Sequence, residues 1–253
     1  MKPLAGKQIL VTRGERQAQS FGSLLEEAGA HPSFLPLIDF RIRKKTPEMD
    51  KLLADINQFD WIVFTSTNGV RYFFTLFEGM LEKPLVAAVG TKTAIALKEK
   101  GVHPNLVPAL YEAGALANAL WHVIDPGAKI LVVKGQLGRQ TIKCQLEKLG
   151  VRVTELIVYD TVLPEEAKKE AQSLSQRCFD YATVTSASTA RHLATILTDV
   201  QLDVKQIACI GPITAGVAKK EGLSPLIVAT EYTTEGLLQV MLKQENMRRG
   251  SRN

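Results

Sequence analysis

The chain has 253 residues, of which 45% are hydrophobic and 23% are charged. This length suits two α/β domains of about 120 residues, each able to bury a core, and no apolar stretch approaches the ~20 residues of a membrane-spanning helix. The formal charge is +5, and the last eleven residues supply +3 of it, from Lys243, Arg248, Arg249 and Arg252 against Glu245. Nucleic-acid-binding proteins more often carry a basic stripe on a folded element, so we expect no nucleic-acid partner and a solvated, frayed tail.

The cysteines and the N-terminus are those expected of a cytoplasmic protein. Cys144, Cys178 and Cys209 lack the paired spacing of a zinc site, and unpaired thiols suit a reducing compartment. The N-terminal residues contain no long apolar segment, so we expect no secretory signal.

Short β-branched segments alternate with segments whose apolar residues recur at helical spacing. In chain order, strands are predicted at residues 8–12, 34–38, 61–64, 86–89, 106–107, 130–133, 153–158, 181–184, 207–210 and 226–228. Helices are predicted at 16–28, 93–101, 113–123, 138–149, 214–222 and 234–242. Gly29 and Gly150 follow two of these helices, as a C-cap requires. The polar segments 39–58 and 160–178 are predicted to connect two lobes.

The chain contains two copies of one unit. Ile9–Gly14 reappears as Ile130–Gly135, an offset of 121 residues, and Leu25–Gly29 matches Leu146–Gly150 at the same offset. Further blocks agree in the same order, among them Phe59-Asp60 with Phe179-Asp180, Ala87–Gly90 with Ala208–Gly211, and Tyr111 with Tyr232. Agreement over so many separated blocks indicates a tandem of two related units.

Repeated strand–helix–strand units predict an α/β fold with parallel sheets, covered by helices on both faces and joined by right-handed crossovers. A flavodoxin-like order of five strands is expected in each lobe. The sequence leaves open whether each lobe is one whole repeat or an exchange of parts between the repeats.

Open α/β sheets bind ligands at the carboxyl ends of their strands, where loops lead into helix N-termini. Six such loops are rich in small or hydroxyl residues, and the backbone N–H groups that begin a helix suit anions. Ordinary helix capping explains each loop equally well by itself, whereas six loops lining one cleft favour a polyanion. The expected substrate-binding residues are Thr12, Arg13, Ser66, Thr67, Asn68, Gly90, Thr93, Lys134, Gly135, Arg139, Ser186, Ser188, Gly211 and Thr214.

Tyr159 is the candidate catalytic residue. Its repeat mate is Ile38, so the hydroxyl belongs to the second copy alone. A tyrosine at a strand end is usually a packing residue with one hydrogen bond, but a phenol is protonated at neutral pH and can donate a proton. The sequence has no GxxxxGK[ST] or GxGxxG loop, no GxSxG nucleophile elbow, and no metal-ligand spacing among its histidines.

Several of these segments together resemble the uroporphyrinogen-III synthase family. The resemblance rests on Val11-Thr12-Arg13, Phe64–Val70, Val89–Ala94, Ile157–Thr161 and Ile210–Ala215, and it covers residues 8–242. The chain departs from the family pattern in two places. Lys134 stands where the family often has Arg, and Ile213 stands where it often has a first threonine.

The resemblance implies two flavodoxin-like lobes with parallel five-stranded sheets, joined by a two-stranded β-ladder, with parts exchanged between the repeats. One lobe would combine residues 1–38 and 162–253, and the other would span 42–158. The linker strands would lie within 37–43 and 156–162.

It also implies the reaction. The substrate would be hydroxymethylbilane, a linear tetrapyrrole with eight carboxylates, and the product would be uroporphyrinogen III, formed with loss of water and inversion of ring D. Tyr159 would be the general acid for the leaving hydroxyl. No metal or organic cofactor would take part, and we expect a cytoplasmic monomer that does not bind membranes.

The main alternative is a two-lobed protein that binds a small anion without catalysis. A nucleotide-sugar transferase would need an acidic metal-binding motif, which the sequence lacks. A scaffold of receiver-like lobes would not need hydroxyl-rich loops in both halves.

Overall fold

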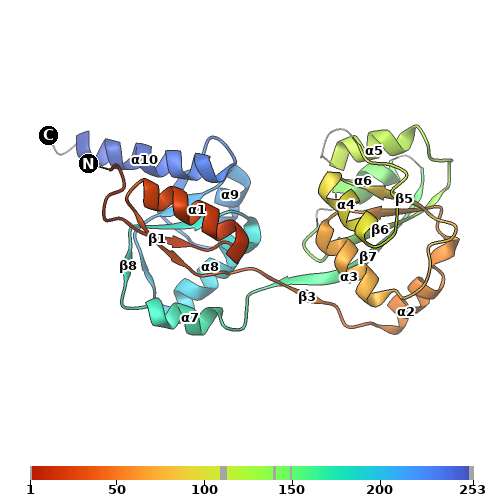
Figure 1. The fold of residues 1–253 in the computed structure, drawn as a ribbon, viewed down its shortest axis with the longest axis horizontal. Helices are drawn as coiled ribbons and strands as arrows, with labels where there is room; N and C mark the ends of the chain where they lie inside the picture. The colour runs from red at the N-terminus through yellow and green to blue at the C-terminus, as the bar shows by residue number, and fades with distance from the viewer. Residues whose placement is uncertain (1, 109–112, 139–140, 149, 251–253) are drawn as a thin grey trace. The chain divides into compact units, whose positions relative to one another are not determined.

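The computed structural model describes residues 2–108, 113–138, 141–148 and 150–250. The chain divides into two compact units (Figure 1). Unit 1 comprises Met1–Asp39 and Val162–Asn253, and unit 2 comprises Phe40–Thr161.

Unit 1 contains a five-stranded sheet in the order β12-β11-β9-β1-β2. Its strands are β1 (Gln8–Val11), β2 (His31–Phe34), β9 (Tyr181–Val184), β11 (Ile207–Cys209) and β12 (Leu226–Val228). All neighbouring pairs are parallel. A short parallel pair, β8 (Cys178–Phe179) and β10 (Asp203–Val204), lies beside this sheet.

Helices cover both faces of the unit 1 sheet. One core packs α1 (Glu15–Glu27) and α10 (Thr234–Gly250) against β1, through residues such as Phe21, Leu237 and Ile9. The other core packs α7 (Ala167–Leu174), α8 (Ala187–Val200) and α9 (Pro212–Lys220) against the opposite face. Burial on both faces explains why these strands are continuous apolar runs.

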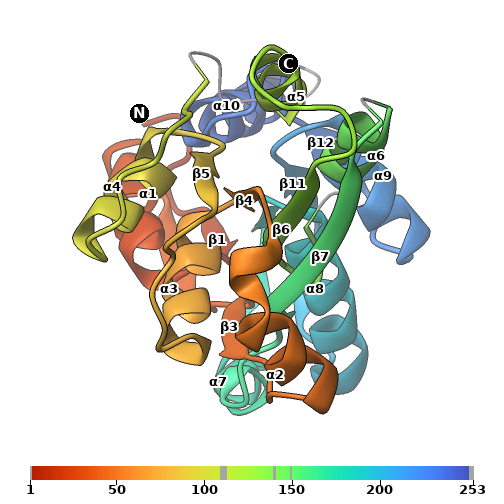
Figure 2. The ribbon, with the colours of Figure 1, turned by 90° about the vertical axis from the view of Figure 1, so that its right-hand side faces the viewer.

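Unit 2 repeats this arrangement with the strand order β3-β7-β6-β4-β5. Its strands are β3 (Asp39–Ile42), β4 (Trp61–Phe64), β5 (Leu85–Ala88), β6 (Lys129–Gly135) and β7 (Arg152–Val162), and Leu106 adds a parallel bridge to Ala87 beyond β5. Strands β6 and β7 run in parallel side by side (Figure 2). One face is covered by α2 (Pro47–Ala54), the 3₁₀ helix η1 (Ile56–Gln58), α3 (Thr67–Leu76) and α4 (Thr91–Glu99), and the other by α5 (Ala113–Trp121) and α6 (Thr141–Glu147).

The predicted α/β fold class is confirmed. The unit 1 sheet has the flavodoxin-like order, and in unit 2 the strands β7, β6, β4 and β5 lie in the same order as their copies β2, β1, β9 and β11, with β3 added at the edge. In unit 1, β2 lies at one edge beside β1, and β9, β11 and β12 follow in that order on the other side of β1. Strand β1 pairs with β9 from the second repeat, whereas β4 from the first repeat pairs with β6. The two repeats have therefore exchanged parts.

Several predicted elements differ from the structure. The strand predicted at 34–38 lies instead at His31–Phe34, and the segment 153–158 belongs to the longer strand β7. The polar segments predicted as connections contain the helices α2 and α7. The strand predicted at 106–107 is only the bridge at Leu106.

The prediction of a frayed basic tail is wrong for the described residues. Helix α10 continues to Gly250, and Glu245 near its end is only 5% exposed. Glu245 accepts hydrogen bonds from the Tyr181 hydroxyl at 2.7 Å and from Arg248 at 2.8 Å, and it pairs with Lys7 at 3.0 Å. Arg249 donates to the carbonyl of Pro3. Tyr181, Lys7 and Pro3 lie far from the tail in sequence, so composition could not reveal these contacts. No helix within the described ranges is long and apolar enough to cross a bilayer.

Candidate active site

Tyr159 lies near the carboxyl end of β7, beside Gly135 at the end of β6. A register shift between Lys134 and Gly135 brings Gly135 opposite Tyr159. A Cβ atom added to Gly135 would lie 2.4 Å from Cζ of Tyr159 and 2.8 Å from its hydroxyl oxygen. The tyrosine ring therefore rests directly on the glycine, and position 135 has no room for a side chain.

The Tyr159 hydroxyl lies 3.3 Å from Oγ of Ser66. Ser66 is the N-cap of α3, and its Oγ also accepts a hydrogen bond from the Gly69 N–H at 2.9 Å. A hydroxyl can accept and donate at once, so the same oxygen caps the helix and contacts the phenol. The contact is longer than the usual 2.7–2.8 Å between hydroxyls, so it holds the phenol weakly.

Two further aromatic rings contact Tyr159. Phe40 meets it edge to face, with the ring centroids 5.5 Å apart, and Tyr72 lies 5.4 Å away at a 33° tilt. The Tyr72 hydroxyl donates to the carbonyl oxygen of Phe40 at 2.6 Å. The guanidinium of Arg71 lies 5.5 Å from the centre of the Tyr72 ring, within the range of a cation–π contact. Sequence reasoning missed Phe40 and Tyr72, since neither belongs to a recognisable motif.

Lys134 is not an exposed cation. Its side chain is 3% exposed, and its Nζ forms a 2.8 Å ion pair with Glu155, which is 17% exposed. A substrate carboxylate would have to compete with Glu155 for this charge. The structure thus gives Lys134 a structural partner that the sequence did not indicate. Arg139, the other cation expected on this loop, lies outside the described residues.

The remaining expected residues of unit 2 lie at the starts of α3 and α4. Thr67 is exposed and Asn68 is partly exposed in the first turn of α3. Gly90 is the N-cap of α4 and has no side chain to bond the first N–H groups, while Thr93 is buried. The rim of this sheet therefore presents two helix N-termini, each with the positive end of its dipole.

Unit 1 has a similar rim at the carboxyl ends of its strands. Ser186 caps α8 by accepting from the Thr189 N–H at 3.1 Å, and Ser188 is partly exposed. Gly211 caps the start of α9 without a side chain. Thr214 is buried in the first turns of that helix.

Thr12 and Arg13 follow β1 on the same rim. Thr12 is fully buried, and its hydroxyl donates to the Thr183 carbonyl. The Thr12 carbonyl accepts from the Leu37 N–H at 3.2 Å, so the residue presents no free surface to a ligand. Arg13 is partly buried, and burial lowers the pKa of its guanidinium while the nearby Glu235 carboxylate opposes that shift. Ser66, Gly135 and Tyr159 are thus the expected residues that the structure brings into contact.

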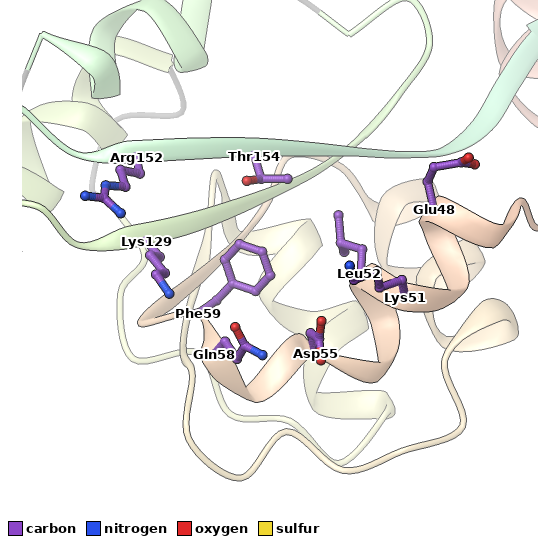
Figure 3. Close-up of a pocket in the computed structure, with 9 residues that line it drawn as sticks. All are labelled: Glu48, Lys51, Leu52, Asp55, Gln58, Phe59, Lys129, Arg152 and Thr154. Carbon is purple, nitrogen blue, oxygen red and sulfur yellow. The ribbon is translucent and has the colours of Figure 1, made fainter.

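A cavity of about 430 Å³ lies away from these residues (Figure 3). Leu52 and Phe59 line it together with Lys129 and Arg152, the first residues of β6 and β7. It therefore lies at the amino end of these strands, whereas Gly135 and Tyr159 lie at the carboxyl end. Among the described residues, no group of His, Cys, Asp or Glu is arranged to hold a metal ion.

Comparison with known proteins identifies relatives along almost the whole chain. The model of the family described as "Uroporphyrinogen-III synthase HemD" matches residues 19–239. A uroporphyrinogen-III synthase of Chlorobaculum parvum is 30% identical over 232 residues, which cover 88% of this chain and 92% of that protein. A porphyrin biosynthesis protein HemD of Ruminiclostridium josui is 27% identical over 96% of this chain, which spans only about half (49%) of that relative.

The fold also has a solved counterpart. The crystal structure of uroporphyrinogen-III synthetase from Helicobacter pylori superposes with a TM-score of 0.63 at 17% identity, and the alignment covers 94% of this chain and 99% of the other. At that identity the likeness concerns the fold.

Proposed function

Because the chain belongs to the uroporphyrinogen-III synthase family, we propose that it closes hydroxymethylbilane into uroporphyrinogen III, with loss of water and inversion of ring D. This makes it an enzyme of porphyrin biosynthesis. The matched region, residues 19–239, includes Tyr159 and the starts of α3, α4, α8 and α9, but not Thr12 and Arg13. The observation that carries the chemical part of the proposal is the position of Tyr159 at the carboxyl end of β7, in contact with Ser66.

Tyr159 is the general acid of the proposed reaction. The substrate loses a hydroxyl group, which leaves readily only when it is protonated, and a positioned acid accelerates such a step by roughly 10²–10⁴-fold. The Tyr159 hydroxyl is a suitable donor because its neighbour, Ser66, holds it only through a 3.3 Å contact. After proton transfer, the Ser66 hydroxyl can turn to donate to the phenolate oxygen.

The helix N-termini of the two rims bind the substrate's carboxylates. Gly90 and Gly211 begin α4 and α9 without side-chain caps, so N–H groups of the first turn are available to an anion. Ser66 and Ser186 cap α3 and α8 and leave the other N–H groups of those turns for the ligand. Neutral donors of this kind accommodate a polyanion without a strongly basic surface.

The proposal includes a monomeric enzyme of the cytoplasm. Cys144 and Cys178 are exposed and unpaired, which suits a reducing compartment. Size-exclusion chromatography with light scattering measures the oligomeric state directly, and a mass near twice 27.8 kDa would contradict a monomer.

The deciding experiment supplies freshly prepared hydroxymethylbilane to the purified protein and separates the products by chromatography after oxidation to porphyrins. The type III isomer is the expected product. Accumulation of only the symmetric type I isomer, at the rate seen without protein, would rule out the proposed activity. Binding without turnover would favour the anion-binding alternative.

A further inference from the structure

The phenol of Tyr159 is held more firmly by its ring than by its hydroxyl. Its hydroxyl lies 3.3 Å from Oγ of Ser66, which is long for a hydrogen bond between two hydroxyls. The hydroxyl of Tyr72, by contrast, donates to the Phe40 carbonyl at 2.6 Å. The shorter hydrogen bond therefore joins two neighbours of Tyr159 and does not involve the Tyr159 hydroxyl.

The hydrogen bond from the Tyr72 hydroxyl to the Phe40 backbone carbonyl joins the two residues whose rings contact Tyr159. Phe40 approaches its ring edge to face at 5.5 Å, Tyr72 lies at 5.4 Å, and Gly135 closes a further side through its backbone. Phe40 lies in β3, which is hydrogen-bonded to β7, so the bond anchors the Tyr72 ring to the strand beside the one that carries Tyr159. Phe40 is also the first residue of unit 2.

Helix α3 contacts Tyr159 twice, once at its hydroxyl and once at its ring. Ser66 is the N-cap of α3 and Tyr72 lies within the same helix, so α3 touches the hydroxyl of Tyr159 at one point and its ring at another. Arg71 lies over the Tyr72 ring at 5.5 Å and restrains it further.

From this geometry we propose that Tyr72 is a positioning residue for the reaction, acting through its hydrogen bond to Phe40 to hold the Tyr159 phenol at the angle from which it donates its proton. This inference rests on the proposed function of Tyr159. Tyr72 itself transfers no proton, because its hydroxyl proton is bonded to the Phe40 carbonyl. Its removal should lower the rate of the chemical step and leave substrate binding unchanged.

The test is a double-mutant cycle between Tyr72→Phe and Tyr159→Phe, with kcat and KM measured on hydroxymethylbilane. Tyr72→Phe keeps the ring and loses only the hydrogen bond. Since a misplacement of about 1 Å can cost up to ~10²-fold, we expect kcat to fall by roughly threefold to thirtyfold at unchanged KM. In the Tyr159→Phe background, Tyr72→Phe should have no further effect, since no acid remains to be positioned.

Thr75→Ala is the matched control. Thr75 is an exposed residue of α3 whose hydroxyl donates to the carbonyl of Arg71 at 3.0 Å within the same helix, so its loss should leave kcat unchanged. Thermal unfolding of every variant separates lost positioning from lost folding. If Tyr72→Phe unfolds the protein, the cycle is repeated with Arg71→Gln in its place. This variant removes the cation over the Tyr72 ring at an exposed position and should lower kcat by a smaller factor.

The outcomes separate the two proposals. Normal kcat in folded Tyr72→Phe, or equal losses in the presence and absence of the Tyr159 hydroxyl, would overturn the positioning role and leave Tyr159 as the acid. Normal kcat in Tyr159→Phe would remove the acid, and the positioning role with it.

Discussion

Gly135 and Tyr159 face each other across β6 and β7 so closely that a methyl group at position 135 would lie 2.4 Å from Cζ of the phenol ring. The absence of a side chain at one residue therefore determines where the other can place its hydroxyl.

Replacement of Gly135 by alanine should displace this phenol. We expect Gly135→Ala to lower kcat by at least about tenfold, a loss similar to that of removing a general acid. The control is Gly216→Ala in α9, where an added Cβ meets nothing within 4 Å. That change should raise stability by about 0.5–1 kcal/mol, because alanine loses less backbone freedom in a helix. Steady-state kinetics and urea unfolding measure both effects, and equal activities of the two variants would contradict the close contact.

Tyr159→Phe should lower turnover by at least roughly tenfold while substrate still binds, because the variant loses the proton donor and keeps the ring. Single-turnover kinetics separate binding from chemistry. Near-normal turnover would exclude Tyr159 from the mechanism without affecting the family assignment.

The two serine caps allow a paired comparison. Ser66 and Ser186 cap α3 and α8 in the same way, so Ser66→Ala and Ser186→Ala should each cost about 1 kcal/mol of unfolding free energy. Ser66 alone also contacts Tyr159. We therefore expect a lower kcat in Ser66→Ala, and a raised KM with unchanged kcat in Ser186→Ala. Equal kcat in the two variants would show that the contact with the phenol is not used.

The buried pair of Lys134 and Glu155 should contribute to folding more than to substrate binding. Glu155→Gln leaves a lysine that is 3% exposed without its counter-charge. Breaking a buried pair in this way costs about 3–5 kcal/mol, whereas replacing both partners by apolar residues can be nearly neutral. The double variant Lys134→Met/Glu155→Leu should thus recover most of the stability lost in Glu155→Gln. A large increase in KM in the stable double variant would instead show that Lys134 binds substrate.

The network around Glu245 predicts acid sensitivity in unit 1. Burial acts to raise the pKa of this carboxyl, but hydrogen bonds from Tyr181, Lys7 and Arg248 outweigh burial, and the net pKa is lowered. A lowered folded-state pKa means that the unfolded chain takes up the proton first as the pH falls. The stabilisation is therefore complete above the ordinary glutamate range, near pH 4.3, and is lost below it.

Glu245→Gln should flatten this dependence. Urea unfolding between pH 3 and pH 7 measures it, with Glu99→Gln as a comparison at an exposed helix residue. A pH dependence identical to that of the parent protein would show that Glu245 does not contribute to it.

The regular elements could be predicted wherever burial alone specifies them. Trp61–Phe64 and Tyr181–Val184 have the bounds that were predicted from their apolar sequences, because central parallel strands are buried on both faces. The strand beside β1 was predicted wrongly. Leu35 and Leu37 are fully buried, but they lie beyond the end of β2, whose residues His31–Phe34 include a proline that only an edge strand tolerates.

The candidate site was predictable only in part. Tyr159 stands out in the sequence because its repeat mate is Ile38. Its neighbours Phe40 and Tyr72 come from segments more than 80 residues earlier in the chain, and no local pattern marks them. The pairing of Lys134 with Glu155 likewise depends on the register of β6 and β7.

The duplication, the alternation of strands and helices, and the hydroxyl-rich helix starts can be read from the sequence, because they follow from local composition and spacing. That β1 pairs with β9 and not with β4 is established by the folded structure. The two candidate strands are copies of one segment, so local propensity cannot choose between them. Contacts with residues far away in sequence can distinguish them. The Tyr181 hydroxyl at the start of β9 donates to Glu245 in α10, whereas Trp61, at the same position of β4, has no hydroxyl to form this bond.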